Sequence, residues 1–199
     1  MKKIVTVLLA LALLLGLACP VFAAEGGFVP SISYKAEPDV VETEGAVAII
    51  RDANGEVADY VKAGCLLITP LADAMDEKKD VPEEIRELLT GLYEALTAGE
   101  MTIPYEKHEA DLKADQMAIR DLFDIRFTCE EHKAMMEQEG YTLEITFDLG
   151  VAKNLELNTM AYDEETEEWN PIVSTTNNQD GTVTFVFDEL CAVEFSVSK

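Results

Sequence analysis

The stretch Tyr141-Thr142-Leu143-Glu144-Ile145-Thr146-Phe147 decides the fold, because its apolar and polar residues alternate strictly. Successive side chains of a strand point to opposite faces, so this segment predicts a half-buried antiparallel strand. Further short β-type segments follow at 155–162, 169–173, 182–187 and 193–197. Asp180-Gly181 supplies the turn chemistry before the third of these. Short strands at such regular spacing predict an antiparallel β-sandwich.

The first half of the chain adds strands to this pattern. Asn54-Gly55, a strong hairpin signal, lies between the apolar segments 46–50 and 56–61. A buried strand is predicted at 65–69, where Pro70 stops it. Residues 28–34 also alternate, and Pro30 restricts that strand to an edge or to its first residues.

One amphipathic helix is predicted at about 82–98. Asp80 can cap it, Pro82 suits its first turn, and Gly99 ends it. One face at helical spacing is apolar and is expected to contact the core: Ile85, Leu88, Leu89, Leu92 and Leu96. Short helices are expected at 71–75 and 133–139, and 117–128 is expected to be extended or partly helical. The fold class is therefore α+β, mainly β, with a helical insertion at about 71–100.

The first 23 residues are typical of a bacterial secretory leader. Lys2 and Lys3 precede an apolar run at 4–18 that is shorter than a membrane-spanning helix, and Val21-Phe22-Ala23 fits cleavage after Ala23. A competing interpretation is a lipoprotein, because Leu17-Ala18-Cys19 is similar to the end of a lipobox and would make Cys19 a lipidated N-terminus. No second apolar span follows, so residues 24–199 are expected to form a single secreted domain.

The charge of the chain limits its partners. Its 199 residues include 15 Lys and Arg against 39 Asp and Glu, a formal net charge of -24. A site for nucleic-acid phosphates needs clustered cations, so we expect no binding of DNA or RNA. Hydrophobic residues make up 48% of the sequence, and so the acidity does not indicate disorder.

Three phrases near the end of the chain carry a family resemblance. They are Trp169-Asn170-Pro171-Ile172, Asp180-Gly181-Thr182-Val183-Thr184-Phe185 and Val193-Glu194-Phe195-Ser196-Val197. Over about residues 141–198 the chain resembles immunoglobulin-like β-sandwich modules of secreted and cell-surface proteins from Gram-positive bacteria, clostridial types in particular. The resemblance implies an immunoglobulin-like fold and a non-catalytic extracellular part that spaces, displays or binds. It assigns no catalytic residue.

The three cysteines after the leader allow two interpretations. Cys65 and Cys191 lie in apolar runs, which favours buried thiols and leaves a Cys65–Cys191 disulfide as the alternative. Cys129 and His132 form a C-x-x-H pair that could chelate zinc, for which Cys65, Cys191 or His108 would have to complete the tetrahedron. The competing interpretation is an exposed histidine beside a half-buried cysteine.

Two further ligand sites are weighed against plainer interpretations. Five carboxylates in Asp163-Glu164-Glu165-Thr166-Glu167-Glu168 could bind calcium weakly, but the run lacks EF-hand spacing and favours a solvated loop. Trp169 could stack on a sugar ring, although its place in a strand favours core packing.

The sequence has no G-x-S-x-G, no H-E-x-x-H and no Gly-rich phosphate loop, so we expect no enzyme. The expected function is a non-catalytic extracellular or surface-associated interaction module for a protein or glycan. The alternatives are a carbohydrate-binding module using Trp169 and a small metal-binding protein using Cys129 and His132.

Overall fold

The computed structural model describes residues 27–28, 39–104 and 117–198. The predicted leader, Cys19 and His108 lie outside these residues. So does most of the strand predicted at 28–34, of which only Phe28 is described, in β1 (Gly27–Phe28), paired with β6 (Ile103–Pro104).

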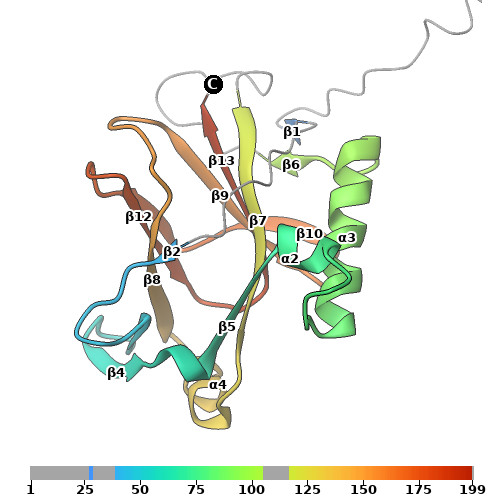
Figure 1. Cartoon of the computed structure of the whole chain (residues 1–199). Helices are drawn as coiled ribbons and strands as arrows, with labels where there is room; N and C mark the ends of the chain where they lie inside the picture. The colour runs from blue at the N-terminus through green and yellow to red at the C-terminus, as the bar shows by residue number, and fades with distance from the viewer. Residues whose placement is uncertain (1–26, 29–38, 105–116, 199) are drawn as a thin grey trace, which may run out of the picture.

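Two antiparallel sheets form the body of the protein (Figure 1). The five-stranded sheet has the order β10 (Glu168–Pro171), β9 (Leu157–Asp163), β13 (Ala192–Ser198), β7 (Met117–Phe127) and β5 (Leu66–Pro70). The six-stranded sheet has the order β11 (Ser174–Asn177), β12 (Thr182–Phe187), β8 (Thr142–Asp148), β3 (Ala48–Arg51) and β4 (Val57–Val61), with β2 (Asp39–Val40) also paired to β8. The prediction of a mainly antiparallel, two-sheet protein is therefore confirmed.

The main core lies between the two sheets because each sheet turns its apolar side chains inward. In β8 the alternation is as predicted: Leu143, Ile145 and Phe147 are buried. Phenylalanines from both sheets meet there, with ring centroids 5.3 Å apart for Phe123 and Phe147 and 5.4 Å apart for Phe185 and Phe195. This packing matches that of a sandwich, in which inner faces interdigitate.

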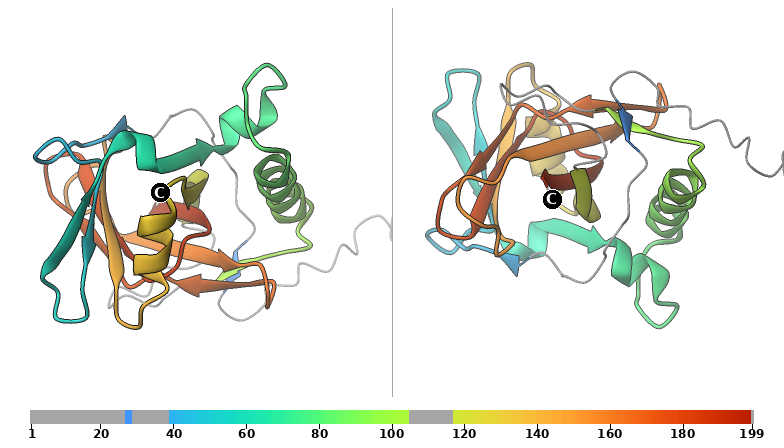
Figure 2. Two further views of the ribbon diagram at one scale, coloured as in Figure 1. Left: turned by 90° about the horizontal axis from the view of Figure 1, so that it is seen from below. Right: turned by 90° about the horizontal axis from the view of Figure 1, so that it is seen from above.

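A second core covers the opposite face of the five-stranded sheet. It is made by α2 (Leu71–Met75) and α3 (Glu83–Ala98), so that the molecule has three layers, with α3 beyond the five-stranded sheet (Figure 2). The buried residues of α3 are those of the predicted stripe: Ile85, Leu89, Leu92 and Leu96, with Leu88 partly buried. The helix ends at Gly99 as predicted, and this residue has a left-handed φ of 72°. It begins after Pro82 without a side-chain cap from Asp80. No helix among the described residues is long and apolar enough to span a bilayer.

The structure corrects or narrows three predicted elements. The segment 117–128, predicted to be extended or partly helical, is extended, because β7 is a continuous strand between β13 and β5. The strand predicted at 169–173 is β10, which ends two residues earlier, at Pro171. A further strand that was not predicted, β11, follows it and pairs with β12 in the other sheet. The helix predicted at 133–139 is α4 (Glu130–Met136), which begins three residues earlier, directly after Cys129.

Two glycines, one in the β3–β4 hairpin and one in α3, allow the assigned backbone conformations to be tested by mutation. Gly55 has a φ of 78°, which an L-amino acid adopts at a cost, whereas Gly91 is an exposed helical residue of α3 with open space around it. Gly55→Ala should lower the free energy of unfolding by about 1 kcal/mol, and Gly91→Ala should raise it by about 1 kcal/mol. Urea unfolding of both variants measures these values. Shifts of the same sign would contradict the assigned backbone conformations.

Candidate functional site: a disulfide beside a buried histidine

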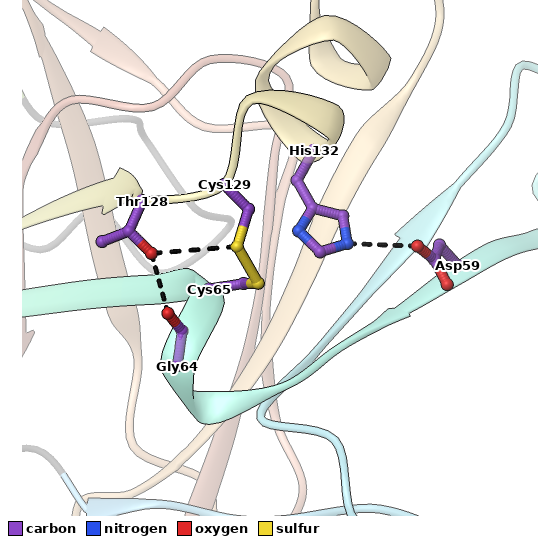
Figure 3. Close-up of a disulfide and its surroundings, with 6 residues drawn as sticks. All are labelled: Asp59, Gly64, Cys65, Thr128, Cys129 and His132. Atoms are coloured by element: carbon purple, nitrogen blue, oxygen red, sulfur yellow. Dashed lines mark hydrogen bonds and ion pairs between the residues drawn. A yellow bond between two sulfur atoms is a disulfide. The ribbon is translucent and has the colours of Figure 1, made fainter.

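A disulfide joins Cys65 to Cys129, which are 64 residues apart in sequence (Figure 3). Cys65 ends the 3-10 helix η1 (Ala63–Cys65) just before β5, and Cys129 follows β7. The antiparallel pairing of β5 with β7 continues into this loop: the Thr128 amide donates to the Cys65 carbonyl at 3.0 Å and the Thr128 hydroxyl donates to the Gly64 carbonyl at 2.8 Å. The Cα atoms of the two cysteines are thereby held 5.1 Å apart, within the usual range for a disulfide.

The predicted Cys65–Cys191 bridge is wrong, and so is a free buried thiol at Cys65. Cys191 lies directly before β13, and β13 and β5 flank β7 on opposite sides. Two strand spacings of about 4.8 Å therefore separate these cysteines, which is beyond the roughly 7 Å that a disulfide tolerates. Cys191 itself is a buried free thiol, as the other interpretation predicted, and burial raises its pKa to about 12.

His132 lies on α4 next to the disulfide and is only 7% exposed. The expectation of an exposed histidine is therefore wrong. Its Nε2 atom is 3.1 Å from an Asp59 carboxylate oxygen on β4, and its ring packs against Phe127 with centroids 5.4 Å apart. Nδ1 is buried and has no hydrogen-bond partner among the described residues. In Figure 3 this side of the ring faces the two sulfur atoms.

Cys65, Cys129 and His132 form the one cluster of three potential metal-ligand side chains found in the described part of the chain. Their ligand atoms all lie within 4.8 Å of one another. The sequence indicated Cys129 and His132 through their spacing and considered Cys65 among several candidates for a third ligand. It gave no signal for Asp59, because the contact depends on β4 lying beside α4. While the disulfide is intact, neither sulfur is a thiolate, and the thiolate is the form that binds metals.

Trp169, the predicted sugar platform, belongs to the second core. It is 6% exposed, its indole Nε1 donates to the Met101 sulfur at 3.0 Å, and its ring is tilted against Tyr162 with centroids 5.2 Å apart. Stacking on a sugar requires an open aromatic face. The role of Trp169 as a binding platform is therefore corrected to core packing, the interpretation that the sequence favoured.

The acidic run 163–168 forms the exposed turn between β9 and β10. The Asp163 carboxylate accepts hydrogen bonds from the amides of Glu165 at 2.8 Å and Thr166 at 3.3 Å and from the Thr166 hydroxyl at 2.8 Å. The hydroxyl bond, followed by the amide bonds, lowers the pKa of Asp163. These contacts explain the turn, which is the solvated loop that the sequence favoured.

A surface groove lies where α3, β7 and the β9–β10 turn meet, with a volume of about 410 Å³. We call it the α3–β7 groove. Its apolar lining comes from Leu67, Pro82, Ile85, Phe127 and Leu190, and its polar lining comes from Glu84, Arg126, Thr128, Lys133 and Glu164. A second hollow of about 360 Å³ shares Glu164 and Leu190 with it. Its remaining lining is three acids, together with Tyr162 and Cys191: Asp163, Glu165 and Glu189. The groove therefore continues into an acidic surface.

Arg126 is the centre of the charges in the α3–β7 groove. Its guanidinium contacts Asp124 at 2.9 Å, Glu164 at 3.2 Å and Glu84 at 3.4 Å. The Asp124 side chain is fully buried, and this burial raises its pKa while the bond from Arg126 opposes the increase. Glu84 and Glu164 are exposed at the rim, with 73% and 56% of their side-chain surface accessible. Arg126 thus faces three carboxylates, and with Lys133 as the second cation of the lining the groove carries at most one net negative charge.

A buried carboxylic acid lies on the α3-facing side of the five-stranded sheet. Glu194 is 0% exposed, and one of its oxygens accepts hydrogen bonds from Asn158 at 3.2 Å and Ser196 at 3.1 Å. Burial raises the pKa of Glu194 to about 8, and these two bonds only partly oppose it. The side chain is therefore mostly protonated at neutral pH.

Comparisons with known proteins give no relative. No family model, no curated protein and no solved structure matches this chain. A fold alone does not assign a function, so the assignment rests on the chemistry of the groove and of the disulfide cluster.

Proposed function

We propose that this protein is a non-catalytic module, exported from the cell, that binds a cationic extracellular protein segment in the α3–β7 groove. The groove itself is the observation that carries the proposal. Its apolar lining can bury hydrophobic side chains, and its acidic rim leads into a second acidic hollow. Binding sites commonly combine an apolar floor with a few polar groups that fix orientation.

The charge of the groove favours a basic partner. Glu84 and Glu164 share the cation Arg126, and the adjoining hollow adds Asp163, Glu165 and Glu189, which outnumber the other cation of the lining, Lys133. The chain as a whole carries a net charge of -24. Complementary charge increases the rate of association and excludes partners of the same sign. A protein partner is favoured over a glycan because Trp169 is buried and offers no open ring.

The state of the cysteines supports export and the absence of catalysis. Disulfides persist in oxidising compartments, so the Cys65–Cys129 bond agrees with the leader predicted at 1–23. A buried Cys191 with a pKa of about 12 is a poor nucleophile. We also propose that this protein is one of the immunoglobulin-like modules of Gram-positive surface proteins. The two antiparallel sheets support this, as do the closing strands β12 and β13, whose sequences carry the resemblance.

A peptide-binding assay tests this function. The probe is a short synthetic peptide that alternates Arg with Leu, compared by calorimetry with the same peptide carrying Glu in place of Arg. The Arg peptide should bind, more weakly as salt increases, and the Glu peptide should not. Glu84→Gln with Glu164→Gln should weaken binding about fivefold, because each rim charge contributes roughly 0.5 kcal/mol.

The matched control is Glu42→Gln with Glu56→Gln, which removes two exposed carboxylates that do not line the groove. This control should bind the Arg peptide like the wild type. Equal binding of both peptides, or equal weakening in both double variants, would contradict the proposal. Binding of neutral oligosaccharides with no peptide binding would support the glycan alternative instead.

A further inference from the structure

The inference concerns the disulfide cluster, by which we mean Cys65, Cys129 and His132. We propose that, when the Cys65–Cys129 disulfide is reduced, the two thiolates and His132 Nδ1 form a zinc site, so that metal binding and the disulfide exclude each other. The three ligand residues adjoin the α3–β7 groove through Phe127 and Thr128 but do not line it, and the proposal does not depend on the function proposed there.

The ligand atoms are already gathered in the oxidised protein. Both sulfurs and a His132 ring nitrogen lie within 4.8 Å of one another. They come from three places: the end of η1, the short connection between β7 and α4, and α4 itself. Two thiolates with an imidazole nitrogen are a ligand set typical of zinc, which takes three protein ligands and a water when one position stays open.

His132 is oriented as a metal ligand rather than as an ordinary core residue. A carboxylate only accepts hydrogen bonds, so Asp59 at 3.1 Å fixes the hydrogen on Nε2 and leaves the lone pair of a neutral ring on Nδ1. That atom is buried, lacks a partner within the described residues and faces the sulfurs (Figure 3). Histidines that bind metals commonly donate their other ring N–H to a carboxylate in this way.

The two states interconvert by balanced steps. A dithiol reductant donates two electrons and two protons to the S–S bond, which gives two protein thiols and the oxidised, cyclic disulfide of the reductant. Zinc then displaces both thiol protons, forms two Zn–S bonds and accepts the Nδ1 lone pair. In the reverse direction a small-molecule disulfide accepts two electrons from the two thiolates and two protons from water, and leaves as two thiols. The Cys65–Cys129 bond forms again and the zinc ion is released.

Zinc titration of the reduced and oxidised protein tests the proposal. A phosphine reductant is used because it breaks the disulfide without offering thiols that compete for the ion. With a chromogenic chelator as competitor, the reduced wild type should bind one equivalent of zinc and the oxidised wild type none. Cobalt in place of zinc should give the intense visible and near-ultraviolet bands of tetrahedral thiolate ligation.

Variants separate this cluster from other sites. Cys65→Ser with Cys129→Ser should abolish binding in both redox states, His132→Ala should weaken it at least tenfold, and Asp59→Asn should weaken it about tenfold to a hundredfold. Cys191→Ser is the control, because it removes the buried thiol outside the cluster and should leave binding unchanged. Binding that survives the double serine variant, or that is lost with Cys191→Ser, overturns the proposal.

Thermal unfolding tests the proposal even if reduction destabilises the fold. Zinc should raise the melting temperature of the reduced wild type and leave that of the oxidised wild type unchanged, because the ion binds only the reduced native state. A reduced protein that zinc neither stabilises nor restores to the folded state contradicts the proposal.

Discussion

Removal of the Cys65–Cys129 disulfide should lower the free energy of unfolding by about 4 kcal/mol. The bond closes a loop of 64 residues, and the entropy that such a loop removes from the unfolded chain corresponds to this value. Urea unfolding of the double variant Cys65→Ser with Cys129→Ser, compared with the wild type in the absence of metal, measures the difference. The wild type under reducing conditions should unfold like the variant.

The control for this prediction is Cys191→Ser in oxidising and reducing conditions. This variant keeps the disulfide, so reduction should destabilise it by the same amount as the wild type. A wild type whose unfolding midpoint is unaffected by reductant would contradict the assigned bond. So would a Cys191→Ser variant that no longer responds to reduction, because that result would assign the bond to Cys191.

The Glu194→Gln variant should change how stability depends on pH. The folded-state pKa of Glu194 is raised from 4.5 to about 8, so between these values the native state keeps a proton that the unfolded chain releases. The wild type therefore loses up to about 1.4 kcal/mol of stability from this group for each pH unit of increase, or about 5 kcal/mol over the whole interval. Glutamine has a similar shape and never ionises, so the variant should lack this loss.

The measured quantity is the difference in free energy of unfolding between Glu194→Gln and wild type from pH 5 to pH 8.5. It should grow steadily in favour of the variant up to about pH 8 and then level off. Glu168→Gln, at an exposed position of β10, is the matched control and should show a constant difference. A pH-independent difference for Glu194→Gln would mean that Glu194 is already ionised in the native protein at pH 5.

Local patterns predicted most individual elements. The alternation of 141–147, the Asn54-Gly55 turn and the apolar stripe of α3 each depend on residues close in sequence, and the structure confirms all three. The central strand β7 was harder to predict. It is enclosed by β5 and β13 and by cores on both faces, so polar residues such as Asp124 are buried within it and interrupt any simple period.

The candidate site could not be predicted in full, because it is formed by contacts between segments that are distant in sequence. Cys65 meets Cys129 because β5 pairs with β7, and His132 is buried because Asp59 of β4 lies beside α4. Neither pairing leaves a local signal, and so C-x-x-H indicated only two of the three residues of the cluster. The α3–β7 groove likewise combines α3, β7 and the β9–β10 turn, which no sequence spacing relates.

Mapping the bound peptide by NMR is the strictest test of the α3–β7 groove as a binding site. On titration with the Arg–Leu peptide, we expect chemical-shift changes at the methyl groups of Leu67, Ile85 and Leu190 and at the Arg126 side chain, which line the groove. The indole of Trp169, buried in the second core, should stay unchanged. Changes confined to the outer face of the six-stranded sheet, or no changes at saturating peptide, would contradict a binding module that uses this groove.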